Sequence, residues 1–125
     1  MARILVIDDD ADLREVILEA LHSAGHEARG AADGAQGLDL QHERPADVVI
    51  TDIFMPDKEG IETIRELRQE FPRVKIIAMS GGGVHVKRAG YLSTASELGA
   101  DVVLRKPFEP AVLLDSIRTV LNRSG

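Results

Sequence analysis

The sequence has no cysteine, which excludes a disulfide framework and a metal site built from thiolates. It has no apolar run near the roughly 18 residues that a membrane-spanning helix needs, and its start, Met-Ala-Arg before an apolar run, is not a signal peptide. It also lacks basic excess, because the net charge is −6, which argues against direct nucleic-acid binding. We therefore expect a cytoplasmic protein that contacts neither a membrane nor nucleic acid directly.

What is present is typical of one globular domain spanning residues 1–125. The chain has 125 residues, of which 44% are hydrophobic and 29% charged, and no linker or low-complexity segment divides it. A chain of this length buries roughly two-thirds of its unfolded surface, enough for an ordinary core.

Four short apolar runs predict buried strands. They are Ile4–Ile7, Val48–Ile50, Ile76–Met79 and Val102–Leu104. Each run is continuous rather than alternating, as expected for parallel strands covered on both faces. The polar stretch Glu27–Ala32 suits an edge strand.

Helical spacing of apolar residues separates these runs. Helices are predicted around Leu13–Leu21, over Gly34–Glu43, around Ile61–Phe71, over Tyr91–Leu98 and around Leu113–Leu121. Asp10 or Asp12 caps the first helix and Gly25 follows its end, while Pro110 fits the first turn of the last. The alternation predicts an α/β fold: a (βα)5 doubly wound parallel sheet with helices on both faces. We expect the flavodoxin-like strand order 2-1-3-4-5, which is a common order for five such strands.

A polar residue follows each strong strand. Asp8 and Asp9 follow the first, Asp52 ends the third, Ser80 the fourth, and Lys106 comes just after the fifth. Parallel strands end at one rim, where such sheets bind ligands. We expect the first two acids to lie one strand spacing, about 4.8 Å, from Asp52, and the lysine to lie about two spacings away.

Three carboxylates in one small cleft repel each other unless a cation joins them. Mg²⁺ suits two carboxylates, a carbonyl and several waters. Phosphoryl transfer needs positioning and charge neutralisation, and Lys106 and Ser80 would supply both beside Asp52. The pattern therefore predicts Mg²⁺-dependent formation of an aspartyl phosphate on Asp52.

The sequence resembles the response-regulator receiver domain of two-component signalling (CheY-like). The resemblance rests on "ILVIDDDADLREVILEAL", "DVVITDIFMPDKEGIETIRELR", "IIAMSGGG" and "GADVVLRKPF", which cover nearly the whole chain. It implies that Asp52 is the phosphoacceptor, that Asp9 binds Mg²⁺ directly and that Asp8 acts more often through water. It further implies a metal contact from the Phe54 carbonyl, the role of the switch Ser/Thr for Ser80, and the place of the family's invariant-type lysine for Lys106.

Two backbone features also come from the resemblance. The Lys106–Pro107 bond resembles the family's cis peptide, and Gly60 matches the glycine that closes the loop after the acceptor. Two positions depart from the usual pattern. Val103 stands where an aromatic switch residue is common, and Gly81-Gly82-Gly83 follows the switch serine, which predicts a mobile loop there.

The resemblance implies a partner, a histidine kinase or a histidine phosphotransfer protein, that donates the phosphoryl group. The chain would catalyse its own phosphorylation and slow dephosphorylation rather than act as a conventional enzyme. The surface of the fourth helix, fifth strand and fifth helix would then bind an unknown downstream protein. We expect a receiver without a DNA-binding output domain, either as a stand-alone protein or as the N-terminal domain of a longer one. Dimerisation on activation is left open.

Three other interpretations remain. A phosphatase of the haloacid-dehalogenase type would use Asp8 as nucleophile, but it leaves Asp52-x-x-Met-Pro unexplained. A nucleotide-binding module lacks its glycines, and His22 and His26 are better explained as surface histidines than as zinc ligands. A scaffold would tolerate loss of Asp52 phosphorylation.

Overall fold

The computed structural model describes residues 2–53, 60–81 and 99–122. Its five strands are β1 (Arg3–Ile7), β2 (Glu27–Ala31), β3 (Val48–Asp52), β4 (Lys75–Ser80) and β5 (Val102–Arg105). They pair in parallel in the order β2-β1-β3-β4-β5. The predicted fold, strand order and polar edge strand are confirmed. The predicted helix at 91–98 and the glycine loop at 82–83 lie outside the described residues.

Four helices are described: α1 (Ala11–Ser23), α2 (Gly34–Glu43), α3 (Gly60–Glu70) and α5 (Pro110–Asn122). Of the two predicted caps for α1, the structure uses Asp10, whose carboxylate accepts hydrogen bonds from the backbone N–H groups of Asp12 and Leu13. Gly25 follows α1 with φ +89°, a conformation that glycine adopts without strain. Among the described residues, no helix is both long and apolar enough to cross a membrane.

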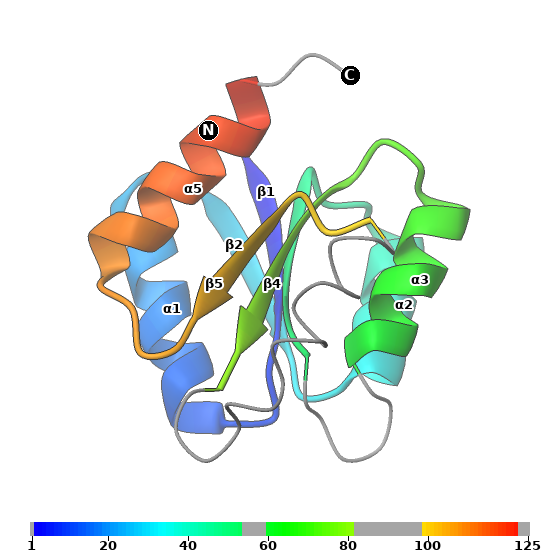
Figure 1. Ribbon diagram of the computed structural model, residues 1–125, viewed down its shortest axis with the longest axis horizontal. Coiled ribbons are helices and arrows are strands. Elements are labelled where there is room, and N and C mark those ends of the chain that lie inside the picture. The colour runs from blue at the N-terminus through cyan, green and yellow to red at the C-terminus, as the bar shows by residue number, and fades with distance from the viewer. Residues whose placement is uncertain (1, 54–59, 82–98, 123–125) are drawn as a thin grey trace.

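Helices cover both faces of the sheet. Figure 1 shows α1 and α5 on one side and α2 and α3 on the other. The α1/α5 side buries Ile4, Val6, Ile50, Ile77 and Met79 from the strands, and the α2/α3 side buries Leu5, Ile7, Val49, Ile76 and Ala78. Because successive strand residues face opposite layers, both kinds of position must be apolar, which explains the continuous apolar runs.

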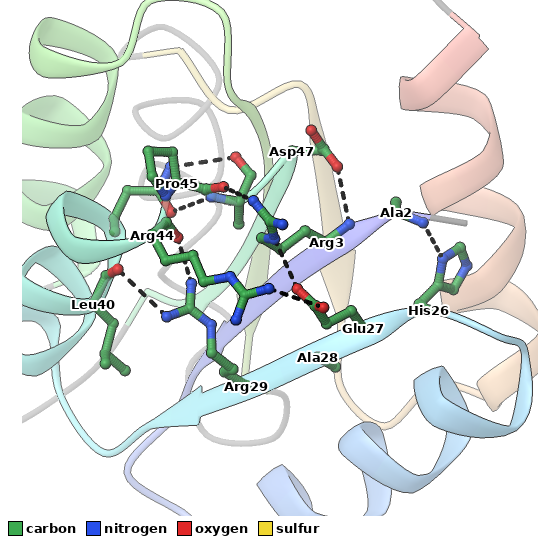
Figure 2. A network of polar contacts seen from close by, with 12 residues as sticks. Ala2, Arg3, His26, Glu27, Ala28, Arg29, Leu40, Arg44, Pro45 and Asp47 are labelled. Carbon is green, nitrogen blue, oxygen red and sulfur yellow. Dashed lines mark hydrogen bonds and ion pairs between the residues drawn. The ribbon is translucent and has the colours of Figure 1, made fainter.

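A polar network joins the amino ends of the strands (Figure 2). This is the end of the sheet opposite to the predicted site residues Asp8, Asp52 and Lys106. Arg3 Nε lies 2.7 Å from a carboxylate oxygen of Glu27, and Arg44 reaches the other Glu27 oxygen at 3.2 Å. The backbone N–H of Arg3 donates to the Asp47 carboxylate at 2.9 Å. These contacts join the first residues of β1 and β2 to the segment that enters β3.

Candidate functional site

The carboxyl ends of β1 and β3 bring three acids together. Ile7 pairs with Thr51 in the sheet, so Asp8 and Asp52 follow side by side. One carboxylate oxygen each from Asp8, Asp9 and Asp52 lies within 4.8 Å of the others. The predicted convergence of acids from two neighbouring strands is therefore what the structure shows.

Asp8 is fully buried and held from several directions. One carboxylate oxygen accepts a hydrogen bond from the backbone N–H of Asp10 at 2.9 Å. The other accepts from Lys106 Nζ at 2.8 Å, and the backbone N–H of Asp8 donates to the Ala31 carbonyl at 3.1 Å. A buried charge needs this kind of compensation, so Asp8 is fixed rather than available to rotate.

Lys106 bridges the two buried acids. Its Nζ lies 2.8 Å from Asp8 and 3.3 Å from Asp52, and its side chain is 18% exposed. Burial alone would lower the pKa of Lys106, but the hydrogen bond to Asp8 and the negative charges of Asp52 and Asp8 outweigh burial and raise the pKa above its usual value. The lysine thus stays charged and neutralises part of the acidic cluster.

Ser80 reaches the same rim from β4. Met79 pairs with Asp52 in the sheet, so Ser80 lies one residue beyond that pair, and it is 4% exposed. Its hydroxyl donates to the Gly81 carbonyl at 3.3 Å, and its own carbonyl accepts the Lys106 N–H at 2.7 Å. The backbone contact fixes Lys106 next to Ser80.

Gly60 packs against the main chain that carries Asp52. Its N–H donates to the Ile53 carbonyl at 2.8 Å. A Cβ at Gly60 would lie 2.1 Å from the Asp52 carbonyl oxygen, so a side chain there would force the backbone to move. The Lys106–Pro107 peptide is cis, as the resemblance predicts. Phe54 lies outside the described residues.

The acidic cluster fits a hard divalent cation. Octahedral Mg²⁺ has ligand distances of about 2.1 Å, so opposite ligands are about 4.2 Å apart, close to the spread of the three oxygens. Asp9 is exposed and so can meet an ion that arrives from solvent.

The two histidines considered as zinc ligands contact the backbone instead. His22 Nε2 contacts the Ala28 carbonyl, and His26 Nδ1 accepts a hydrogen bond from the Ala2 N–H, so these two rings form backbone contacts rather than a zinc pair.

Sequence reasoning missed two residues that hold the acids in place. Asp10 was predicted as a possible helix cap at the end of the first strand, yet its N–H also donates to the Asp8 carboxylate. Arg14 was not singled out, yet its guanidinium donates to the Asp8 carbonyl at 2.6 Å. The Asp-x-x-x-Arg spacing around the helix start was the available signal, but it does not reveal which carbonyl the arginine reaches.

Comparison with known proteins settles the family. Residues 4–118 match the family model of the response regulator receiver domain. This chain belongs to that family. It is 38% identical over 124 residues to the transcriptional regulatory protein CpxR of Escherichia coli (strain K12), covering 99% of this chain and 51% of CpxR. It is 35% identical to protein CcdB of Bacillus subtilis (strain 168), covering 98% of this chain and 99% of CcdB.

The solved structures agree. A response regulator receiver domain protein from Clostridium thermocellum superposes with a TM-score of 0.90 and 33% identity, over 98% of this chain and 96% of that one. The receiver spans about half the length of the first curated relatives that it matches. Response regulators receive phosphate from histidine kinases, and receiver domains bind Mg²⁺ at an acidic pocket.

The family match does not support the phosphatase alternative. The site geometry agrees, because both carboxylate oxygens of Asp8 already hold hydrogen bonds and the side chain is inaccessible to solvent. A nucleophile must approach the phosphorus atom in line, and the contacts that hold Asp8 do not favour such an approach.

Proposed function

We propose that this receiver takes a phosphoryl group onto Asp52, from the phosphohistidine of a histidine kinase or a histidine phosphotransfer protein. The observation that carries the proposal is the convergence of three acids and Lys106 at the ends of β1, β3 and β5. Asp52 is 6% exposed, whereas Asp8 is inaccessible, so Asp52 is the buried acid that a donor can still reach.

The metal would be held by Asp9, Asp52 and the Phe54 carbonyl, with Asp8 acting through water. Bound Mg²⁺ would supply positive charge for the phosphoryl oxygens and reduce the repulsion among the acids. Asp8 suits a water-mediated role because its own oxygens are already hydrogen-bonded to Asp10 and Lys106.

In the transfer step, an Asp52 carboxylate oxygen would attack the phosphorus atom as the phosphorus–nitrogen bond to the histidine breaks. The electron pair of that bond stays on the imidazole nitrogen. Lys106 would move its ammonium from Asp52 to a phosphoryl oxygen, and the Ser80 hydroxyl would turn from Gly81 to bind another. Water would later attack the phosphorus atom and break its bond to the Asp52 oxygen, which releases inorganic phosphate and restores the free carboxylate.

The phosphoryl group would be sensed through β5. Lys106 follows β5 directly, and its N–H is bonded to the Ser80 carbonyl, so movement at the site would reach β5 and α5. The position where an aromatic switch residue is common holds Val103, which packs on the α2/α3 side of the core. Because valine has no ring, switching here would not use an aromatic side chain. A downstream protein would bind this altered surface, and two conformations would shift in population.

Incubation with acetyl phosphate, with and without Mg²⁺, tests the proposal. Intact-mass spectrometry should show one added phosphoryl group in the wild type only when Mg²⁺ is present. Asp52→Asn should show none, and borohydride trapping should map the modification to Asp52. Asp39→Asn, an exposed acid on α2, is the matched control and should behave as wild type. Modification mapped to Asp8 would overturn the proposal.

Partner and output need a separate experiment. A pull-down with and without beryllofluoride, a mimic of the phosphoryl group, should recover a partner that depends on both the mimic and Asp52. The absence of direct nucleic-acid binding and the cytoplasmic location are predictions from the sequence, which leaves dimerisation on activation open. If Asp52→Ala bound the same partners as the wild type, the scaffold interpretation would replace the switch.

A further inference from the structure

Arg14 contacts main-chain carbonyls, not carboxylates, of the acidic segment Asp8–Asp10 between β1 and α1. It lies in the first turn of α1, where its N–H donates to the Asp10 carbonyl at 2.9 Å. Its guanidinium Nη1 donates to the main-chain carbonyl of Asp8 at 2.6 Å. Hydrogen bonds from a charged donor are shorter and stronger than neutral ones, so this contact holds the Asp8 carbonyl firmly.

Gly30 provides the path that Arg14 follows to reach this carbonyl. A Cβ at Gly30 would lie 2.9 Å from Arg14 Cδ and 3.2 Å from Arg14 Cγ. The aliphatic part of the arginine therefore lies directly on the β2 backbone. A side chain at Gly30 would require Arg14 to shift, and we expect this shift to disturb its contact with Asp8.

Asp9 is the acid that depends most on this arrangement. Within the described part of the chain, the Asp9 carboxylate has no hydrogen bond or ion pair, in contrast to Asp8. The positions that this carboxylate can reach are therefore limited only by its backbone and its side-chain rotamers. The Asp8 carbonyl and the Asp9 N–H belong to one planar peptide unit, so a hydrogen bond to that carbonyl orients the unit from which Asp9 projects.

We propose that Arg14 is a positioning residue for the Mg²⁺ site: it fixes the Asp8–Asp9 peptide so that Asp9 faces Asp52. The inference rests on the proposed function, in which Asp9 and Asp52 share the ion. Its predicted effect on Mg²⁺ affinity is opposite to the effect of charge alone. A cationic guanidinium beside a cation site repels the ion, so its removal should tighten Mg²⁺ binding if charge were its only effect. Positioning predicts the opposite.

Calorimetric titration of Mg²⁺ at fixed ionic strength separates the two effects. Arg14→Ala should bind Mg²⁺ about fivefold more weakly than the wild type, the change expected from losing one net hydrogen bond. Arg118→Ala is the matched control, since it removes an arginine from an exposed pair with Asp115 on α5 and should leave the affinity unchanged.

Gly30→Ala tests the same contact without changing charge. It keeps the Arg14 guanidinium but displaces the side chain, so it should also weaken Mg²⁺ binding. In the Arg14→Ala background its effect should disappear, apart from any strain against Leu18, whose Cδ1 would lie 3.1 Å from the new Cβ. In metal-free protein, the carbonyl ¹³C shift of Asp8 should move in both single variants, while Arg118→Ala leaves it in place.

Each outcome decides one question. If the wild type does not bind Mg²⁺, the proposed function fails. If the wild type binds Mg²⁺ but Arg14→Ala binds it equally or more tightly, the positioning role alone fails. If Arg14→Ala does not fold, Gly30→Ala decides, because unchanged affinity in that variant overturns the role of Arg14.

Discussion

Lys106 Nζ lies 2.8 Å from the carboxylate of Asp8, so one hydrogen bond joins residues that are 98 positions apart in the sequence. The same ammonium is 3.3 Å from Asp52. Without a bound ion, the receiver thus uses its own lysine as the cation that makes two buried acids tolerable.

Replacement of Lys106 should destabilise the metal-free protein. Lys106→Met leaves Asp8 and Asp52 buried without their shared cation, and breaking such a pair costs about 3 kcal/mol. Urea unfolding in EDTA measures this loss, and added Mg²⁺ should restore part of it by binding the folded state. The control is Arg118→Ala, which breaks an exposed pair and should change the free energy of unfolding little. Equal stability of Lys106→Met and wild type would contradict the bridging role.

The same bridge predicts a loss of stability at alkaline pH. The pKa of Lys106 is raised in the folded state above its reference of 10.5, so the folded protein holds this proton more tightly than the unfolded chain. The stabilisation is therefore complete below pH 10.5 and is lost as the pH rises through the folded pKa. Unfolding free energies measured from neutral pH upward in wild type and Lys106→Met should converge in that alkaline range. If the two curves of unfolding free energy against pH stayed parallel, the charge of Lys106 would not contribute to stability through its pairing with Asp8 and Asp52.

A side chain at Gly60 should disturb the strand end that carries Asp52. Gly60→Ala places a Cβ 2.1 Å from the Asp52 carbonyl oxygen and 2.4 Å from Ile53 Cα. Both are backbone atoms, so the clash can be relieved only by distorting the end of β3. We expect a loss of about 2 kcal/mol in unfolding free energy and slower phosphorylation by acetyl phosphate. Gly81→Ala is the matched control, because no atom of the described residues lies within 4 Å of its Cβ position. Similar effects of both substitutions would refute the close-packing argument.

Neutralising Asp9 should separate stability from metal binding. Asp9→Asn removes one negative charge from the cluster, so the melting temperature in EDTA should rise while Mg²⁺ binding weakens. The rise should be small, because Asp9 is exposed and solvent screens its repulsion. Asp39→Asn, outside the cluster, should change neither quantity. A lower melting temperature for Asp9→Asn in EDTA would argue against repulsion within the cluster.

Much of the fold followed from the sequence, because local and topological signals agreed. The helix Gly34–Glu43 was predicted with its observed bounds, since Pro45 and the preceding polar residues delimit it. The meeting of Asp8, Asp9 and Asp52 followed from strand order alone, because parallel strands end at one rim.

Contacts that depend on side-chain paths did not follow. The sequence predicted Lys106 about two strand spacings from Asp52, with its side chain closing most of the gap, but the hydrogen bond to Asp8 needed the positions of β1 and β5. The path of Arg14 across Gly30 likewise depends on how α1 packs on β2, which periodicity does not encode. The contribution of Phe54 stays a prediction.

The network around Arg3, Glu27 and Asp47 connects β1, β2 and the segment that enters β3 at the end remote from the acids (Figure 2). These contacts and the residues proposed to bind the ion therefore occupy opposite ends of one sheet. Substitutions in the loops at the acidic end can thus alter the site while leaving this network in place.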